Sequence, residues 1–523
     1  MRKSSNRVYK TLVVGVIVLF IGIGIQPAIS DVNKKTYKLI SKGNTLYVGG
    51  VGPDNYTTIT SALNDVEHGD TIFVYNDSSP YIERLKIYKS INLIGEDKYS
   101  TIIDGNKQFS VIDLNARDVI ISGFTIQNSH DKNDGRSSGI GLFSYNITIT
   151  NNIIRDNRNG IFVERETNNL IKDNLVYNNW QNGIDIDYGS NHIIMNNEIV
   201  RSGVYDIYIR ASDNNIISNN SIISENCWAS VLVHDSKNST IINNVVKSIS
   251  PGEWQEGIYL RKCPGSRIIG NKVSNSGYHG IFLDNIHDII VQNNSLVDDG
   301  FFFSDCYNID FIYNTVNGRP VVYLENTEDK VVDEDAGQVI LNSCSGITVK
   351  NQNINNSFYG IILINNSKYC SIINNNLKSN KVGVFLVNSN NNKIENNSFE
   401  SNYRYGAFLE NVKNCLIQNN IFINNTVGLM IDNDKSNRLG NKVEYNNFIN
   451  NDKQADFVVK DKWFFRPIRW RYNYWDDIGI RLFYIYIIHG KFFKYYSDSQ
   501  QRVFRSYRFI DWHPAKEPYD IEV

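Results

Sequence analysis

The sequence predicts an all-β protein, a parallel β-helix in which short strands stack into a long coil. A motif that starts at a Gly-Ile step recurs at a fixed interval, since Gly160 and Gly183 are 23 residues apart. Within each copy the apolar residues alternate, as at Ile161 and Val163, which is the period of a strand. Strands this short need a partner, so each copy is expected to pair with the next copy along the chain.

The repeat extends from about Gly139 to Asn451. The spacing of 23 residues returns between Gly257 and Gly280 and between Gly360 and Gly383. Asn pairs mark the turns, where Asn tolerates a left-handed backbone, and stacked Asn side chains are expected to form a hydrogen-bonded ladder. These pairs are Asn196-Asn197, Asn219-Asn220, Asn243-Asn244, Asn293-Asn294, Asn396-Asn397 and Asn419-Asn420.

Residues 1–30 predict a signal peptide, so the protein is expected to be secreted or held at the cell surface. Basic residues such as Arg2 and Lys3 precede an apolar run of about 14 residues, Leu12 to Ile25, and small residues follow it. A membrane span needs about 20 residues. An uncleaved anchor is the alternative, and it is the one membrane contact that we expect.

Residues 31–455 are expected to form the β-helix domain, which starts with a cap. Thr58 to Val66 has helical spacing, and a short helix there would cover the open end of the first strands. Between Thr315 and Gly346 the repeat is lost, which predicts an inserted loop at about 316–346.

Residues 456–523 are expected to form a C-terminal capping segment. The segment is rich in aromatic and basic residues and holds four of the seven tryptophans: Trp463, Trp470, Trp475 and Trp512. A cap would bury these rings against the last strands, whereas an exposed or membrane-interfacial patch is the alternative.

The composition limits the kinds of partner that the protein is expected to bind. A net charge of −2 without a basic stretch argues against nucleic acid. The six cysteines form no CxxC motif, and the sequence does not say which of them are close enough to pair. They are Cys227, Cys263, Cys306, Cys344, Cys370 and Cys415, of which Cys370 and Cys415 are a weak candidate for a thiolate metal site.

Two columns of outward-facing residues are expected on the strands that follow the Gly-Ile step. In such a strand the first and third residues after the glycine point inward, so the second and fourth point outward. The fourth positions are Glu164, Asp187, Arg210, His234, Arg261 and Asp284. The second positions are Phe162, Asp185, Tyr208, Leu232, Tyr259 and Phe282. Beyond residue 360 the equivalent positions are more apolar, as at Ile362 and Phe385.

Acids, bases and aromatic rings on one sheet face suit an extended polysaccharide or cell-surface glycan. Sugar C–H faces stack on aromatic rings, and guanidinium groups pair with uronate carboxylates. The predicted binding residues are Phe162, Glu164, Asp185, Tyr208, Tyr259, Arg261, Phe282 and Asp284. The alternative is a solvated face whose opposite charges only pair across strands, as Asp187 would with Arg210.

Catalysis is a further hypothesis, with Asp187, Arg210 and His234 as the candidate residues. Neighbouring carboxylates suit a glycoside hydrolase, and a base beside an arginine suits a lyase or an epimerase acting on uronates. The sequence identifies no specific cofactor, and Glu164, Asp185 and Asp187 could supply oxygen ligands to calcium.

Several segments resemble the NosD-like secreted right-handed β-helix proteins. The resemblance covers nearly the whole chain after the signal peptide and includes YTTITSALNDVEHGDTIFV, NGIFVE, NGIDID, HGIFLD, VNGRPVVYL, AGQVILNSCSGITV, NYWDD and DWHPAKEPYD. It implies a right-handed parallel β-helix (solenoid) of the pectate-lyase-like type.

The resemblance implies less about function. The family name comes from an accessory protein in copper-site maturation, whereas similar repeats occur in carbohydrate-binding and sugar-hydrolysing domains. The three methionines and eight histidines here form no copper cluster in the sequence. The full motifs of polygalacturonases and alginate epimerases are missing, so no catalytic residue is carried over. A polysaccharide binder, a polysaccharide-processing enzyme and a structural or adhesive scaffold remain, with a copper accessory protein as a further alternative.

Overall fold

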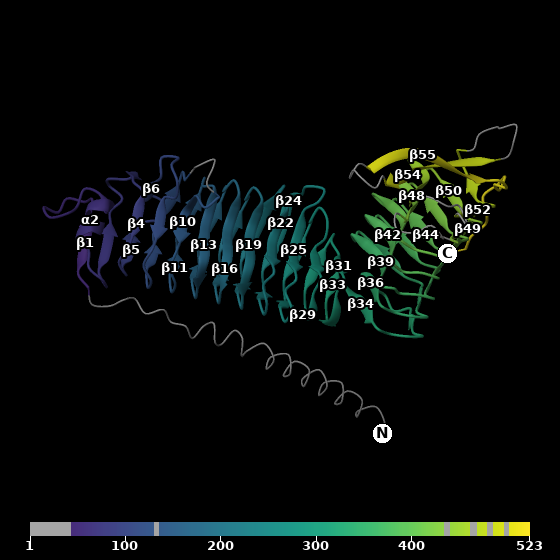
Figure 1. Cartoon of the computed structure of the whole chain (residues 1–523), viewed down its shortest axis with the longest axis horizontal. Coiled ribbons are helices and arrows are strands. Elements are labelled where there is room, and N and C mark those ends of the chain that lie inside the picture. The colour runs from purple at the N-terminus through teal and green to yellow at the C-terminus, as the bar shows by residue number, and fades with distance from the viewer. Residues whose placement is uncertain are drawn as a thin grey trace, which may run out of the picture.

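The computed structural model describes residues 43–129, 135–433, 440–460, 468–477, 485–495 and 502–522. These residues wind into two successive coils of short parallel strands (Figure 1). The prediction of an all-β parallel β-helix is therefore confirmed. The predicted signal peptide lies outside the described residues. Among the described residues, no helix has the length and apolar character to cross a membrane.

The first coil consists of three parallel sheets. Sheet A contains β1 (Thr45–Val48), β2 (Thr71–Val74), β5 (Asn92–Gly95), β8 (Ile120–Ser122), β11 (Thr148–Thr150), β14 (Leu170–Lys172), β17 (Ile193–Met195), β20 (Ile216–Ser218), β23 (Thr240–Ile242), β26 (Arg267–Ile269), β29 (His287–Gln292) and β32 (Tyr307–Ile312). Sheet B contains β3 (Tyr81–Ile82), β6 (Ile102–Asp104), β9 (Thr125–Gln127), β12 (Ile153–Arg155), β15 (Leu175–Tyr177), β18 (Glu198–Val200), β21 (Ser221–Glu225), β24 (Val245–Ser250), β27 (Lys272–Ser274), β30 (Ser295–Val297) and β33 (Thr315–Val316). Sheet C contains β4 (Leu85–Ile87), β7 (Ile112–Leu114), β10 (Ser138–Leu142), β13 (Asn159–Thr167), β16 (Asn182–Ser190), β19 (Tyr205–Asp213), β22 (Ala229–His234), β25 (Glu256–Arg261), β28 (Ile281–Asp284) and β31 (Phe301–Ser304).

The second coil also has three sheets. Sheet D contains β34 (Arg319–Glu325), β36 (Gln338–Asn342), β39 (Tyr359–Ile364), β42 (Val382–Val387), β45 (Tyr405–Glu410), β48 (Val427–Asn433), β51 (Lys453–Lys460), β54 (Tyr486–Tyr495) and β55 (Arg502–Asp511). Sheet E contains β35 (Val331–Val332), β37 (Thr348–Lys350), β40 (Ser371–Ile373), β43 (Lys393–Glu395), β46 (Leu416–Gln418), β49 (Lys442–Glu444) and β52 (Arg469–Arg471). Sheet F contains β38 (Asn353–Asn355), β41 (Asn376–Lys378), β44 (Ser398–Glu400), β47 (Ile421–Ile423), β50 (Asn447–Ile449) and β53 (Tyr474–Trp475).

The alternation of apolar residues places one side of every strand in the core. Ile161 and Val163 of β13 pair with Ile184 and Ile186 of β16, and all four side chains are fully buried. Burying such a column removes apolar surface from water at every turn, which is the main term that stabilises the coil.

The Asn pairs have two distinct roles. The first Asn of a pair has a left-handed backbone, as at Asn196 with φ 56°. The second is buried and reaches the next turn, so that Asn197 Nδ2 donates to Asn220 Oδ1 at 3.1 Å. The predicted ladder is therefore present and consists of the second Asn of each pair. It satisfies buried backbone and amide groups that would otherwise destabilise the interior.

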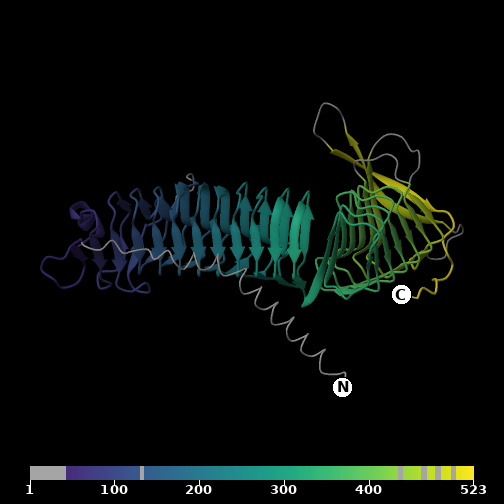
Figure 2. The same ribbon diagram turned by 90° about the horizontal axis from the view of Figure 1, so that it is seen from below.

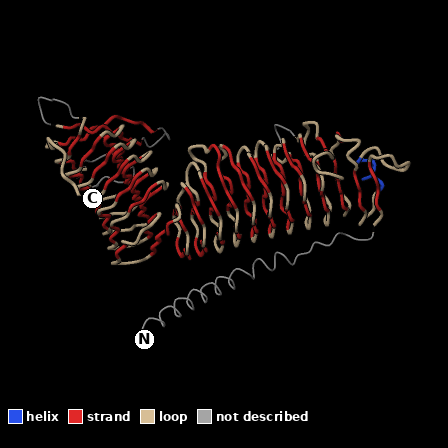
Figure 3. The backbone as a smooth tube through the Cα atoms, turned by 180° about the vertical axis from the view of Figure 1, so that it is seen from behind, coloured by secondary structure: helices blue, strands red, loops and turns tan. Residues whose placement is uncertain are grey.

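A helix covers the N-terminal end of the first coil (Figure 3). This helix, α2 (Ile59–Asp65), buries Ile59 and Ala62 against the core. Thr58 Oγ1 accepts from Ser61 N at 3.1 Å, and the Glu83 carboxylate accepts from two further backbone amides of the first turn. These acceptors satisfy the donors that a helix start leaves free.

The prediction of an inserted loop at 316–346 is wrong. This segment holds β34, β35 and β36, which begin the second coil. β33 and β34 pair in antiparallel fashion through a turn at Asn317-Gly318, with φ 52° and 77°. Two positive φ angles define the tight hairpin turn that Asn-Gly favours. The chain therefore reverses at this point, and the repeat is lost because one coil ends and another starts.

The two coils meet at an angle, and sheet D is the side of the second coil that faces the first (Figures 1 and 2). Phe302, which points outward from sheet C, contacts Tyr359 and Phe385 of sheet D, with ring centroids 5.3 and 6.0 Å apart. Tyr359, Ile362 and Phe385 are buried in the core cluster of the first coil. This contact explains why the outward positions beyond residue 360 are apolar.

The C-terminal segment extends the coil before it closes it. β51, β52 and β53 continue the three sheets, and only β54 and β55 form an antiparallel hairpin. Trp475 is fully buried and stacks on Phe448 at 4.4 Å and on Tyr486 at 4.1 Å. The predicted aromatic cap is thus present in the described residues, with Trp512 left 62% exposed. Trp463 lies outside them.

Candidate functional site

The register of sheet C places the predicted columns side by side. Asp187 pairs with Glu164 in the preceding strand and with Arg210 in the following one. The fourth-position column then continues through His234, Arg261 and Asp284. Six polar side chains from six turns therefore form one line across the outer face of sheet C, each about 4.8 Å from the next.

Ion pairs link neighbours in this line. Arg210 holds Asp187 through two parallel hydrogen bonds, Nε to Oδ1 at 2.6 Å and Nη2 to Oδ2 at 2.5 Å. Arg261 Nε lies 3.2 Å from Asp284 Oδ2. The Arg210 hydrogen bonds are the bidentate geometry that guanidinium favours with a carboxylate. The cross-strand pairing of Asp187 with Arg210 is therefore present.

The second-position column is less open. Phe162 and Asp185 point outward but are only 6% exposed, because neighbouring side chains cover them. Tyr208, Tyr259 and Phe282 are half-buried, and Tyr259 and Phe282 stack with their rings 4.6 Å apart. The accessible aromatic surface of this column thus lies between β19 and β28.

Burial shifts the titration of Asp185 and His234 on this face. It raises the pKa of Asp185 to about 7, while Asn182 Nδ2, which donates to the carboxylate at 2.7 Å, opposes the shift. Burial also lowers the pKa of His234, whose Nε2 lies 3.0 Å from Asp235 Oδ2. Both shifts favour the neutral form of the side chain over its charged form.

Three exposed tryptophans border the face, and the sequence analysis did not identify them. Trp180, Trp228 and Trp254, which we call the tryptophan rim, are 50%, 74% and 58% exposed. They lie in the turns that lead from sheet B into β16, β22 and β25. The repeat would have revealed them, because each comes one or two residues before its strand begins.

Cations accompany aromatic rings at both ends of the strands of this face. The Arg158 guanidinium lies 5.1 Å from the ring centre of Trp180. Arg165 and Arg210 lie 5.7 and 5.5 Å from the ring centre of Tyr188, so two guanidinium groups flank this half-exposed ring. The face therefore combines flat rings with cations, which is the surface that anionic sugars require.

The face ends where the two coils meet. His279 Nδ1 is 3.0 Å from Glu256 Oε2, and its ring stacks on Phe302 at 4.8 Å. Lys381 of the second coil donates to the backbone carbonyl of Gly277 at 2.8 Å, and burial lowers its pKa to about 8. These groups are enclosed between the coils, so they close the face at β28 and β31.

The predicted metal ligands are not assembled into a metal site. Arg210 and Arg136 already engage the carboxylates of Asp187 and Glu164. All six cysteines are buried and unpaired. Within the ranges that the structure describes, no group of three or more His, Cys, Asp or Glu side chains could hold a metal ion.

Comparisons with solved structures return other β-helix proteins at low similarity. One is tailspike protein 2 from Escherichia coli O157:H7 bacteriophage CAB120, with 10% identity and a TM-score of 0.34 over 60% of this chain and 43% of that chain. Another is the mannuronan C-5 epimerase AlgE4 A-module of Azotobacter vinelandii, with 14% identity and a TM-score of 0.26 over 78% of this chain and 97% of that chain. The PL6 family alginate lyase AlyGC matches with 13% identity and a TM-score of 0.33 over 82% of this chain and 88% of that chain. At these values the likeness carries no inference about activity.

Among curated proteins, none matches the chain. Comparison with protein families gives a clearer result. The family described as periplasmic copper-binding protein (NosD) matches residues 63–254 and 312–459, which together exceed half of the chain. The family described as right handed beta helix region matches residues 188–334. The chain therefore belongs to the NosD family and has a right-handed parallel β-helix.

Proposed function

We propose that this protein binds a uronate-containing polysaccharide across the outer face of sheet C. One observation carries the proposal: the register lines up polar and aromatic side chains from six turns beside the tryptophan rim. The coil needs its inward residues and its Asn ladder, but it does not need this outer column. A repeating row of binding groups matches a repeating ligand.

The recognition chemistry follows from the exposed donors. Each guanidinium has five N–H groups, and Arg210 uses two of them to hold Asp187. Its remaining donors, and those of half-exposed Arg261, are available to uronate carboxylates. Tryptophan faces of the rim stack with sugar C–H groups. Tyr208, Tyr259 and Phe282 extend the aromatic surface on the sheet itself.

We assign Asp187, Arg210 and His234 to binding rather than to catalysis. Asp187 is held by Arg210, and His234 contacts Asp235. Asp185, the outward-column carboxylic acid whose pKa is raised to about 7, is covered. A general acid must be within hydrogen-bond reach of the bond that breaks. The arrangement therefore supports recognition better than hydrolysis, elimination or epimerisation.

Copper, which the family description names, does not fit the described side chains. Copper(I) prefers soft thiolate and thioether ligands. Burial raises the pKa values of the thiols of Cys263, Cys306 and Cys415 to about 12, so these groups stay protonated. Each of these three thiols also contacts backbone carbonyls of the coil interior. We therefore derive no copper chemistry from this chain.

A glycan array on the protein without residues 1–30 tests the proposal. The parent protein is expected to bind uronate-containing glycans, and the double variant Asp187→Ala/Arg210→Ala to lose at least tenfold in affinity. The single variant Trp228→Ala removes a stacking face and is expected to weaken binding about fivefold.

Trp512→Ala is the matched control, because this tryptophan is also exposed but lies in the C-terminal cap. It is expected to leave binding unchanged. A parent protein that binds none of the uronate-containing glycans would show that the charged column serves only as a paired, solvated scaffold face.

A further inference from the structure

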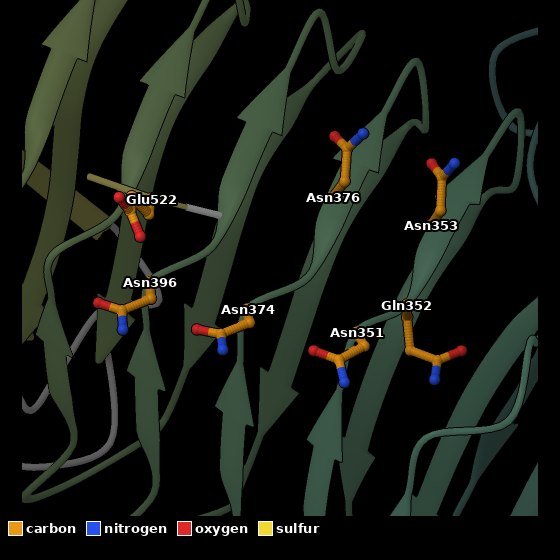
Figure 4. A pocket seen from close by; sticks show the side chains of 7 residues that line it. All are labelled: Asn351, Gln352, Asn353, Asn374, Asn376, Asn396 and Glu522. Carbon is orange, nitrogen blue, oxygen red and sulfur yellow. The ribbon is translucent and has the colours of Figure 1, made fainter. Parts of the chain in front are cut away.

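A polar groove of about 660 Å³ lies on the outside of the second coil, far along the chain from the face of sheet C. It follows the turns that join sheet E to sheet F, so it is built from successive copies of the repeat (Figure 4). Gln352, the carboxylate of Glu522 and five asparagines line it, and the asparagines are Asn351, Asn353, Asn374, Asn376 and Asn396.

The five amides form two rows. Asn351, Asn374 and Asn396 occupy the turn position with a left-handed backbone, at φ 58°, 56° and 53°. Their side chains point the same way, one turn apart (Figure 4). Asn353 and Asn376 are paired neighbours that start β38 and β41 and form the second row. Successive amides in a row are therefore about 4.8 Å apart.

These amides differ from the ladder amides in having no protein hydrogen bond among the residues that the structure describes. The adjacent buried Asn375 donates to Asn397 Oδ1 at 2.8 Å and to a backbone carbonyl at 3.2 Å. At the equivalent turn of the first coil, Asn196 Nδ2 donates to the carboxylate of Asp173 at 3.2 Å. The groove has no such acid beneath its asparagines, so their donors and acceptors face outward.

The C-terminal tail forms a wall of the groove. Ala515 N donates to Asn473 O at 2.9 Å, and Asn447 forms two hydrogen bonds with the backbone of Tyr519, at 2.8 and 2.9 Å. The tail thus lies along the outside of the last turns and brings Glu522 beside the asparagines.

We propose that the groove binds a neutral, hydroxyl-rich oligosaccharide. Each amide offers both donors and an acceptor, and each sugar hydroxyl is both a donor and an acceptor, so the two match in both directions. Among the described residues that line the groove, none has an aromatic or aliphatic side chain, which gives the side chains of a peptide nothing to pack against. Glu522 is the single ionisable group among these lining residues, and its carboxylate repels an anionic chain.

The site is separate from the proposed function of sheet C, which selects anionic sugars with guanidinium groups. The two sites therefore differ in the charge of the ligand that they select. Either binding proposal can be wrong while the other is right.

Calorimetric titration of the full chain with cellohexaose, maltohexaose, chitohexaose and hexagalacturonate tests the proposal. At least one neutral hexasaccharide is expected to bind. The variant Asn374→Gly/Asn376→Val should weaken that binding at least tenfold, because it removes one amide from each row while glycine keeps the left-handed turn. Hexagalacturonate binding should not change in this variant.

The control is Asn219→Gly/Ser221→Val, the same two positions in a turn of the first coil, where Asn219 has φ 54°. It should bind the neutral sugar as the parent does. If the groove variant melts below the assay temperature, the milder Asn353→Ser replaces it and should weaken binding at least threefold.

The proposal is wrong if no neutral hexasaccharide binds, if both double variants lose binding equally, or if an extended Gly-Ser peptide competes for the groove. Loss of hexagalacturonate binding in Asp187→Ala/Arg210→Ala, with neutral binding intact, would show that the two sites act independently.

Discussion

Asp206 occupies the position that Gly160 and Gly183 hold in earlier turns, and the structure gives the reason for this exchange. Its carboxylate is fully buried and accepts from Ser202 N at 3.1 Å and from the Ser224 hydroxyl. Small serine side chains leave room for the acid where other turns need glycine. Burial raises the pKa of Asp206 to about 7, and it also raises the pKa of Asp299, which accepts from Ser276 N.

These shifts predict that stability falls as the pH rises from about 4 to about 7. Over this range the folded protein keeps the proton on Asp206 while the unfolded chain releases it, so the folded state binds more protons. Asp206→Asn removes the contribution of Asp206 to this loss of stability. We expect the variant to be more stable than the parent at pH 8 by roughly 2–4 kcal/mol, and similar to the parent at pH 4.5.

Denaturant unfolding at pH 4.5, 6 and 8 measures the effect. Glu198→Gln, at an exposed carboxylate of β18, is the control and should leave the pH profile unchanged. A parent protein whose stability rises steadily from pH 4.5 to 8 would contradict the assignment.

At the scale of elements, the strands could be predicted from the sequence, whereas the boundary between the coils was missed. The period of about 23 residues and the alternation of apolar residues fix which residues of sheet C share a face, so Asp187 and Arg210 were placed correctly beside each other. The lost repeat after Thr315 was interpreted as a loop, although Asn317-Gly318 is the dipeptide that most strongly indicates a hairpin. The exposure of an outward-facing residue could not be predicted in the same way. Phe162 is buried by neighbouring side chains that the repeat pattern does not specify.

The hairpin between β33 and β34 predicts that a side chain at Gly318 would destabilise the protein through the backbone conformation alone. A Cβ added there would meet no atom within 4 Å, but the residue has φ 77°. Gly318→Ala is therefore expected to lower the free energy of unfolding by about 1 kcal/mol through the left-handed backbone alone.

Gly135→Ala is the matched control, because a Cβ at Gly135 also meets no atom within 4 Å and no positive φ applies. Thermal unfolding of the two variants should show a lower Tm for Gly318→Ala only. Equal melting temperatures would mean that the turn adapts to a side chain without cost.

At the scale of the whole molecule, the angle between the coils depends on an aromatic contact rather than on the repeat. The ring of Phe358 lies 4.8 Å from that of His279, and Phe385 contacts Phe302, so rings of the second coil pack on the last turns of the first. Gln338 adds two hydrogen bonds of 2.9 Å to the backbone of Phe301, which ends sheet C. A repeat pattern describes contacts between neighbouring turns only, so this contact between two coils could not be predicted from it.

Removing the rings at the contact is expected to free the coils from each other while each coil stays folded. Phe358→Ala/Phe385→Ala deletes two buried rings, and each such deletion typically costs 3–5 kcal/mol. Because the inward-facing residues of each coil pack against its own turns, and Phe358 and Phe385 belong to the cluster shared between the coils, the loss should fall on the contact between them. Small-angle X-ray scattering is expected to show a larger radius of gyration, and calorimetry should resolve two transitions in place of one.

Phe73→Ala is the control for this variant, because Phe73 also contacts another ring outside the core, edge to face with Tyr75 at 5.1 Å, but lies on sheet A at the far end of the first coil. It should leave the scattering profile unchanged. An unaltered radius of gyration in the double variant would show that the β33–β34 hairpin and the Gln338 hydrogen bonds suffice to hold the angle. If the radius of gyration of the double variant is unaltered, its binding of uronates to the face of sheet C, which ends at this contact, should also be unaffected.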